Sequence, residues 1–178
     1  MQCPESEAVG LAKSKQTNDT FIKELSNFYI MECQIAEGSF EDLRDITEIN
    51  KVVFGGTKSV EQIKEKLSLS IYQNPHITLG KIDEKLVGYG MGYFEKGKKY
   101  YFWMFGVLPE FRKGGIGKKI LEEQINFAKN NGYKKFLLKT SNKWRDMLRL
   151  TIKMGFDIVG FKANEWGSDS AIWLELDL

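Results

Sequence analysis

Residues 77–108 hold the feature that most restricts the fold, because side-chain polarity alternates there with a period of two. Three stretches carry the pattern, Ile77–Ile82, Lys85–Phe94 and Lys99–Leu108, and only short polar segments separate them. Such alternation is typical of strands, and short connections join antiparallel neighbours. The sequence therefore predicts three consecutive antiparallel strands joined by hairpins.

Helices are predicted on both sides of these strands. Ser39–Asp42 and Ser59–Gln62 have the residue types and spacing of capping boxes, so one helix should begin near Phe40 and a second just after Ser59. Two later helices are predicted from about Gly117 to Asn131 and from Trp144 to Gly155. The remaining strands are predicted at Phe28–Ile35, Lys135–Thr140, Phe156–Phe161 and Ala171–Leu176. Residues 25–178 should form one domain, preceded by an N-terminal extension over 1–24.

The composition is that of a globular domain. The chain has 178 residues, 42% hydrophobic and 13% aromatic, enough to build a core. The chain has 26 Lys and Arg residues against 24 Asp and Glu residues, so its net charge does not favour nucleic acid as a partner. No apolar run approaches the roughly 18 residues of a membrane span, and Met1–Asn18 lacks the apolar segment of a secretory signal. Two cysteines and a single histidine, His76, predict no metal site and fit a reducing cytoplasm.

The segment Arg112–Lys119 reads Arg-Lys-Gly-Gly-Ile-Gly-Lys-Lys and stands between a predicted strand and a predicted helix. Consecutive glycines let backbone N–H groups point toward one place, and a helix start adds partial positive charge, so the segment predicts a phosphate cradle. A Walker A loop would need Gly in place of Arg112 and Ser or Thr in place of Lys119. A dinucleotide-binding loop would need Gly in place of Ile120. Neither an NTPase nor an NAD enzyme is supported.

The residues leading into this loop carry a family resemblance. Phe105-Gly-Val107-Leu-Pro109-Glu-Phe-Arg112 enters the Arg-x-x-Gly-x-Gly run, and Met154-Gly155-Phe156 follows the last predicted helix. From about Tyr29 onward the sequence resembles the GNAT superfamily of N-acetyltransferases in these motifs and in element order. The resemblance implies an α/β (α+β) fold with a mixed, mostly antiparallel central sheet of about seven strands flanked by about four helices.

The resemblance also implies acetyl-CoA or another acyl-CoA as co-substrate, without a metal. The loop backbone would hold the CoA pyrophosphate, and the main chain at Phe105 and Val107 would pair with the pantetheine amides as an added strand would. Asn142 is the best match to the family's Asn at the start of the last helix. The predicted cofactor-binding residues are Phe105, Val107, Arg112, Lys113, Gly114, Gly115, Ile116, Gly117, Lys118 and Asn142.

The expected reaction is attack of a neutral amine on a thioester, which calls for removal of a proton from the amine. Many family members place a Glu on the central strand and a Tyr on the last helix, and here these positions hold Trp103 and Thr151. Asp146 in the last helix is the catalytic candidate, although an acid in a first turn more often stabilises the helix dipole. The missing groups leave open a CoA-binding sensor without transferase activity.

The acceptor is expected to be a small-molecule amine such as an amino sugar or a sugar nucleotide, and an amino group of a protein or peptide stays open. Tyr89, Trp103 and Trp166 are the predicted substrate-binding residues, because flat rings can stack on a sugar or a base. Against this, alternation predicts Tyr101, Trp103, Phe105 and Val107 on one core-facing side of a strand. No nucleic acid or membrane is expected as a partner, and a homodimer stays open. Glycines at 88, 90, 92 and 106 indicate close backbone approach, and they also leave room for an acyl group larger than acetyl.

Overall fold

The computed structural model describes residues 32–56, 58–69, 73–167 and 169–178. The chain divides into two units, Met1–Glu32 and Cys33–Leu178, and all elements given below belong to the second. The extension predicted over 1–24 and the start of the strand predicted at Phe28 lie outside the described residues. Within the described part of the chain, no helix is both long enough and apolar enough to cross a membrane.

Seven strands form one sheet in the order β1-β2-β3-β4-β5-β7-β6. Every neighbouring pair is antiparallel except β4 and β5, which are parallel. The predicted mixed, mostly antiparallel sheet is therefore confirmed. The strands are β1 (Gln34–Gly38), β2 (Gln73–Ile82), β3 (Lys85–Glu95), β4 (Lys99–Val107), β5 (Lys135–Ser141), β6 (Asp157–Trp166) and β7 (Asp169–Asp177).

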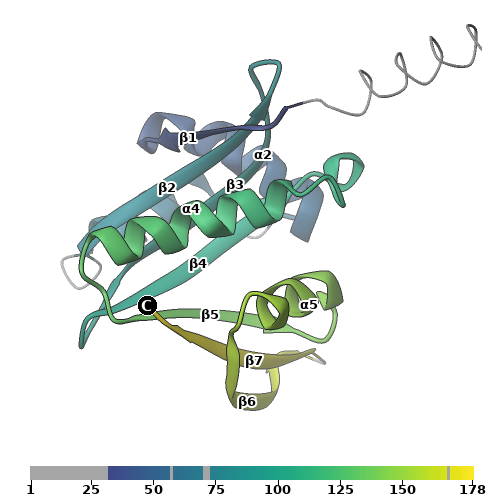
Figure 1. Ribbon diagram of the computed structural model, residues 1–178. Coiled ribbons are helices and arrows are strands. Elements are labelled where there is room, and N and C mark those ends of the chain that lie inside the picture. Colours follow the sequence, from purple (N-terminus) through teal and green to yellow (C-terminus); the bar gives the residue numbers. More distant parts are fainter. Residues whose placement is uncertain (1–31, 57, 70–72, 168) are drawn as a thin grey trace, which may run out of the picture. The chain divides into compact units, whose positions relative to one another are not determined.

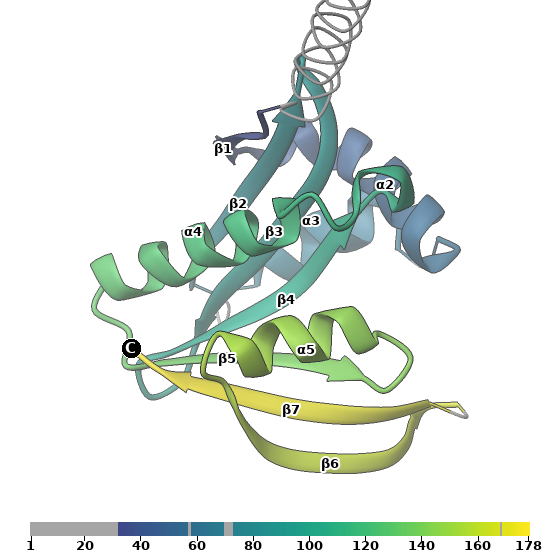
Figure 2. The ribbon, with the colours of Figure 1, turned by 45° about the vertical axis from the view of Figure 1, so that its right-hand side comes forward.

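Helices cover both faces of the sheet (Figures 1 and 2). Buried side chains of α2 and α3 pack on one face against β2 and β3, and those of α4 and α5 pack on the other. The helices are α2 (Leu43–Phe54), α3 (Val60–Ser68), α4 (Ile116–Asn130) and α5 (Arg145–Lys153), with short 3-10 turns η1 (Phe40–Asp42) and η2 (Pro109–Phe111). On the α2 and α3 face, the described helices leave β5, β6 and β7 uncovered.

Both predicted capping boxes are present. The Ser39 side chain accepts from the backbone amide of Glu41, and the Asp42 carboxylate accepts from the Ser39 amide at 2.7 Å. Ser59 and Gln62 exchange the corresponding bonds at the start of α3. The described part of the first strand begins at Gln34 and ends at Gly38, beyond the predicted end at Ile35.

A β-bulge in β4 overturns the predicted face of the central strand. The pairing of β3 with β4 is regular from Glu95 with Lys99 to Gly92 with Phe102. Met91 then pairs with Met104, which leaves Trp103 as an extra residue. One extra residue exchanges the two faces for everything beyond it. Trp103 accordingly packs on the α2 and α3 side, whereas Phe105 packs on the α4 side.

The strand glycines receive neighbouring side chains rather than leaving space. A Cβ atom on Gly90 would lie 2.7 Å from Ile120 and 2.9 Å from Phe102, and one on Gly92 would lie 2.5 Å from the Tyr100 ring and hydroxyl. A Cβ on Gly106 would lie 3.0 Å from Tyr89. Close approach therefore explains these glycines, and the extra room predicted there for a larger acyl group is absent.

Candidate functional site

The sheet opens between β4 and β5. These parallel strands pair only from Lys99 with Lys135 to Phe102 with Leu138, although β4 continues to Val107 and β5 to Ser141. The last residues of β5 pair with β7 alone, so beyond Phe102 the β5-facing edge of β4 has no partner among the described strands. Figure 2 shows the two strands diverging toward the end where α4 begins. An extended chain with amide groups can pair with such an edge.

The glycine loop presents a bare helix N-terminus beside this edge. Gly115 caps α4 in the left-handed conformation, with φ of 82°, and no side chain among the described residues caps the helix. The first bond of α4 runs from the Lys119 amide to the Gly115 carbonyl at 3.1 Å, so the amides of residues 116–118 have no partner within the helix. Unpaired amides at the positive end of a helix dipole form an anion site suited to phosphate.

Two contacts fix this loop on the end of β4. The Arg112 Nε donates to the Val107 carbonyl at 3.0 Å, which joins the loop to the last residue of the strand. A Cβ on Gly117 would lie 3.0 Å from the Phe105 ring, so glycine allows the first turn of α4 to approach the strand closely. The predicted residues from Phe105 to Lys118 thus meet at one end of the opening, and Lys113 and Lys118 are solvent-accessible there.

The residues predicted at the start of the last helix lie at the surface. Asn142 is exposed in the turn that follows β5. Asp146 is in the first turn of α5, where its carboxylate accepts from Arg149 at 3.0 Å with both side chains largely exposed. A ring contact joins the two sides of the opening, because Phe54 at the end of α2 meets Trp144 before α5 edge-on at 5.0 Å.

Thr151 occupies the position where many family members have a tyrosine. Its side chain is fully buried, and its hydroxyl donates back to the helix carbonyls of Met147 and Leu148, each at 3.0 Å. A hydroxyl committed in this way is not available to protonate a leaving group.

The predicted substrate-binding residues occupy different environments. Tyr89 is fully buried, its hydroxyl donates to Asn50 at 3.0 Å, and burial raises its pKa well above the ordinary value. No side-chain surface of Tyr89 remains for a substrate. Trp103 is partly exposed at the bulge, and Trp166 ends β6 opposite Asp169, with its side chain outside the described part of the structure.

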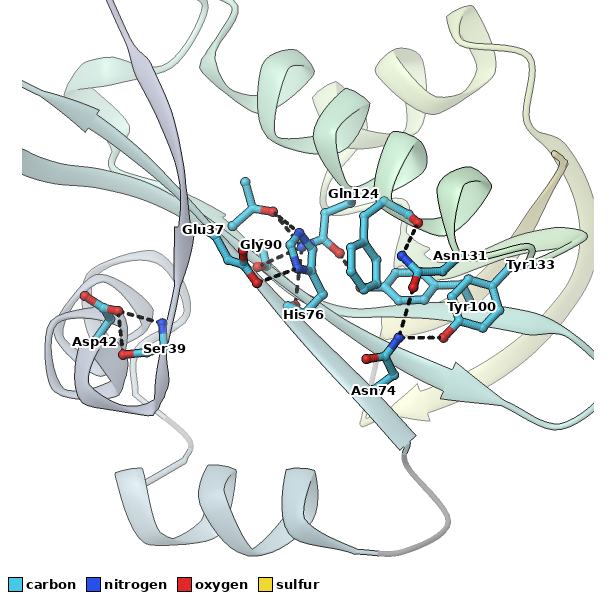
Figure 3. Close-up of polar contacts among 12 residues, drawn as sticks. Glu37, Ser39, Asp42, Asn74, His76, Gly90, Tyr100, Gln124, Asn131 and Tyr133 are labelled. Carbon is cyan, nitrogen blue, oxygen red and sulfur yellow. Dashed lines mark hydrogen bonds and ion pairs between the residues drawn. The ribbon is translucent and has the colours of Figure 1, made fainter.

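Gln124 is a buried polar residue that the sequence reasoning missed (Figure 3). Its Nε2 donates to Thr78 at 2.9 Å and to the Gly90 carbonyl at 3.2 Å, and its Oε1 accepts from the Tyr100 hydroxyl at 2.6 Å. Burial raises the pKa of Tyr100 well above its ordinary value, and Tyr133 adds to the shift, which keeps this hydroxyl a donor. The sequence signal for its burial is that this glutamine falls at helical spacing among the apolar residues of α4.

His76 lies in the same network and away from the opening. It is 5% exposed, stacks on Phe127 with ring centroids 3.8 Å apart, and contacts Thr78 at 3.3 Å through Nε2. Burial lowers its pKa, although Glu37 and Glu123 act in the opposite direction. Among the described residues, no three His, Cys, Asp or Glu side chains are grouped so as to hold a metal ion.

Comparison with known proteins agrees with this geometry. The family model described as "Acetyltransferase (GNAT) family" matches residues 40–156. The ribosomal-protein-S18-alanine N-acetyltransferase from Escherichia coli has the same fold, with a TM-score of 0.71 at 16% identity over 82% of this chain and 93% of that one. A Bacillus subtilis acetyltransferase in complex with CoA gives a TM-score of 0.67 at 18% identity, over 83% of this chain and 99% of that one. A GNAT family acetyltransferase from Elizabethkingia anophelis with acetyl-CoA bound gives a TM-score of 0.66 at 23% identity, over 82% of this chain and 98% of that one.

Two curated proteins match over short segments only. A probable cobalt-precorrin-6B C(15)-methyltransferase (decarboxylating) from Methanococcus vannielii is 34% identical over 55 residues, which is 31% of each chain. A protein of the same description from Methanocaldococcus jannaschii is 49% identical over 43 residues, or 24% of each chain. The match thus spans less than a third of these curated relatives.

Proposed function

Because the chain belongs to the acetyltransferase (GNAT) family, we propose that it is an acyl-CoA-dependent N-acyltransferase whose acceptor is the primary amine of a small molecule. One observation carries the proposal: the unpaired edge of β4 ends beside the bare N-terminus of α4. An acyl-CoA needs both features, since pantetheine is an amide chain and the pyrophosphate is an anion.

The proposed donor site uses main-chain groups on the β5-facing edge of β4 and at the start of α4, where strand pairing and helix bonding end. The amides of residues 114–118 would hold the pyrophosphate, and the main chain of Phe105 and Val107 would pair with the pantetheine amides. Arg112 holds the loop through the Val107 carbonyl, so we assign it a positioning role. The bound acyl-CoA supplies a thioester, whose acyl carbon forms the new bond to nitrogen as the bond to sulfur breaks.

Proton transfer in this proposal relies on water. Residues 100–108 contain no acid, and the Thr151 hydroxyl is bonded to its own helix. The acceptor ammonium therefore loses one proton to solvent before attack, and the nitrogen loses a second as the amide forms, while the sulfur leaves as a thiolate. A thiol pKa of about 8.5 makes the thiolate a competent leaving group near neutrality. Asp146 and Asn142 stay predictions, with Asp146 engaged by Arg149.

Calorimetric titration with acetyl-CoA tests the donor site. A Cβ on Gly114 would meet only the Phe111 carbonyl, at 3.7 Å, so a side chain fits there. The substitution Gly114→Asp places a carboxylate among the amides and should weaken binding at least tenfold, whereas Gly114→Asn, with the same shape and no charge, should weaken it much less.

Three results would contradict parts of the proposal. Wild-type protein that does not bind acetyl-CoA would overturn it as a whole. Equal affinity for the Asp and Asn variants would show that the pyrophosphate does not lie at the loop. Binding without release of thiol in the presence of any amine would favour the CoA sensor instead.

A further inference from the structure

Strand β6 is the last strand of the sheet, and its outer edge has no partner among the described strands. Figures 1 and 2 show no described helix or strand beyond it. Three large apolar residues of β6 are exposed, Ile158 at 56%, Val159 at 55% and Phe161 at 63%. A bare edge with apolar side chains is a template for pairing with another strand, and natural proteins rarely leave such an edge uncovered.

A β-bulge places two of these apolar side chains on the same face of the sheet. Ile158 pairs with Leu174, and Phe161 pairs with Ile172, so Val159 is an extra residue on β6. Paired residues of antiparallel strands point to the same face, and both partners on β7 are buried in the core that α4 and α5 cover. Ile158 and Phe161 therefore lie on the α4 and α5 side of the sheet.

Two opposite charges lie on the other face of β6. Asp157 pairs with Glu175, and Lys162 pairs with Ala171. These two positions on β7 alternate with its core residues, so Asp157 and Lys162 share the face that α2 and α3 leave uncovered. Both are exposed. Lys162 forms an ion pair with Glu165 of its own strand at 2.6 Å, and Asp157 has no ion-pair partner among the residues that the structure describes.

Strand β6 is complementary to itself when two copies run antiparallel. Consider a two-fold axis perpendicular to the sheet and midway between Ile158 and Phe161. It places Ile158 of one copy opposite Phe161 of the second copy, and Asp157 of one copy opposite Lys162 of the second copy. Each pair occurs twice by symmetry, and the same two residues lie between the pairs on both strands, so the bulge does not disturb this register. Apolar pairs and opposite-charge pairs both stabilise neighbouring antiparallel strands.

We propose that the chain forms a two-fold dimer through the outer edges of β6, which joins the two sheets into one continuous sheet. The partner is a second copy because the order of charged and apolar residues on this edge matches its own reversed order. An edge protected against pairing would carry charge in the middle of its exposed stretch, and residues 158–161 carry none. Strands β5 and β7 lie between β6 and the opening beside β4, so the dimer can be tested separately from acyl-CoA binding.

Sedimentation velocity of the full-length protein over about 1–200 μM tests the dimer, because an interface built on one strand from each copy is small and a micromolar Kd is expected. Asp157→Lys and Lys162→Asp each place like charges opposite one another at both symmetric positions. Each variant should raise the Kd of the dimer about tenfold or more.

The double variant Asp157→Lys/Lys162→Asp restores opposite charges between the copies and should return the Kd to within about threefold of wild type. Lys162→Asp also removes the ion pair with Glu165 inside the chain, and the double variant does not restore that pair. Recovery in the double variant can therefore come only from contact between two copies.

A second set of variants tests the apolar pairs. Ile158→Ser should raise the Kd about tenfold, because the apolar contact is lost twice in each dimer. Val52→Ser is the matched control, since Val52 has a similar exposed fraction, 61%, but lies on α2. It should leave the Kd unchanged. Circular dichroism checks that each variant is folded.

Four results would overturn the proposal. Wild-type protein that is monomeric at every concentration would exclude the dimer, whatever covers the edge of β6. A dimer that neither single charge variant weakens would have its interface elsewhere. A double variant as weak as the single variants would contradict the register, and equal effects of Ile158→Ser and Val52→Ser would contradict the apolar pairs.

Discussion

Replacing Gln124 with leucine should destabilise the protein because one buried hydroxyl loses its hydrogen-bond acceptor. Gln124 is fully buried on α4, and its amide bonds to groups on β2, β3 and β4 at once. Leucine fits a similar volume but neither donates nor accepts. Thr78 retains its contact with His76 at 3.3 Å, whereas Tyr100, also fully buried, loses the acceptor of its hydroxyl.

The size of the effect follows from these contacts. A buried hydroxyl left without a partner costs about 1–3 kcal/mol, and the hydrogen bonds lost to Thr78 and Gly90 add about 1 kcal/mol each. Burial of the apolar leucine side chain returns about 1–2 kcal/mol. Gln124→Leu should therefore lower the free energy of unfolding by about 2–3 kcal/mol, which for a domain of this size lowers Tm by about 5–10 °C.

Urea denaturation of a double-mutant cycle is the assay. Tyr100→Phe removes the hydroxyl, so the double variant Gln124→Leu/Tyr100→Phe should lose clearly less stability than the two single variants together, with a coupling of at least about 1 kcal/mol. Additive losses, or a Gln124→Leu variant as stable as wild type, would refute the assigned hydrogen bond. An altered denaturant slope would indicate a change in the unfolded or native ensemble instead.

Two further predictions concern neighbouring residues of the same layer. Gly92→Ala places a Cβ 2.5 Å from the Tyr100 ring and should lower the free energy of unfolding, measured by chemical denaturation, by about 2 kcal/mol. In Gly160→Ala the nearest atom to the new Cβ is 3.5 Å away on Trp173, so the loss should be less than about 0.5 kcal/mol. Equal losses would contradict the packing given for Gly92. His76 has a pKa lowered by burial, so the folded state binds fewer protons than the unfolded state as pH falls below the unfolded pKa of about 6.5. Stability should therefore decline from pH 7.5 to pH 5.5 by more in wild type than in His76→Gln, and parallel pH profiles would exclude His76 as the cause.

Local chemistry made most of the fold predictable from the sequence. Period-two alternation placed β2, β3 and β4, and the side-chain cap at Ser59 placed the start of α3. The cap at Ser39 marks the 3-10 turn η1, and α2 follows at Leu43. These signals are local because capping and alternation involve residues a few positions apart. The loop from Arg112 to Lys118 was likewise found because its glycines are contiguous in sequence.

Features that depend on tertiary packing were not predictable in this way. The extra residue at Trp103 has no mark in the strand pattern, since aromatic and β-branched residues run on either side of it. Gln124 pairs with groups far away in sequence, and its place in the apolar face of α4 does not say which groups it meets. The ring contacts of Tyr101 with Tyr93 and Trp173 join three strands whose order in the sheet no local pattern gives.

The bulge also explains how the side chains of one strand divide between the two faces of the sheet. In a regular strand, Tyr101, Trp103, Phe105 and Val107 would share a face, so Phe105 would lie on the same side as Trp103. With Trp103 as the extra residue, Tyr101 and Trp103 stay on the α2 and α3 side, while Phe105 turns to pack against Gly117 at the start of α4. Phe105 can therefore lie beside the proposed pyrophosphate site, whereas Trp103 lies on the opposite face of the strand.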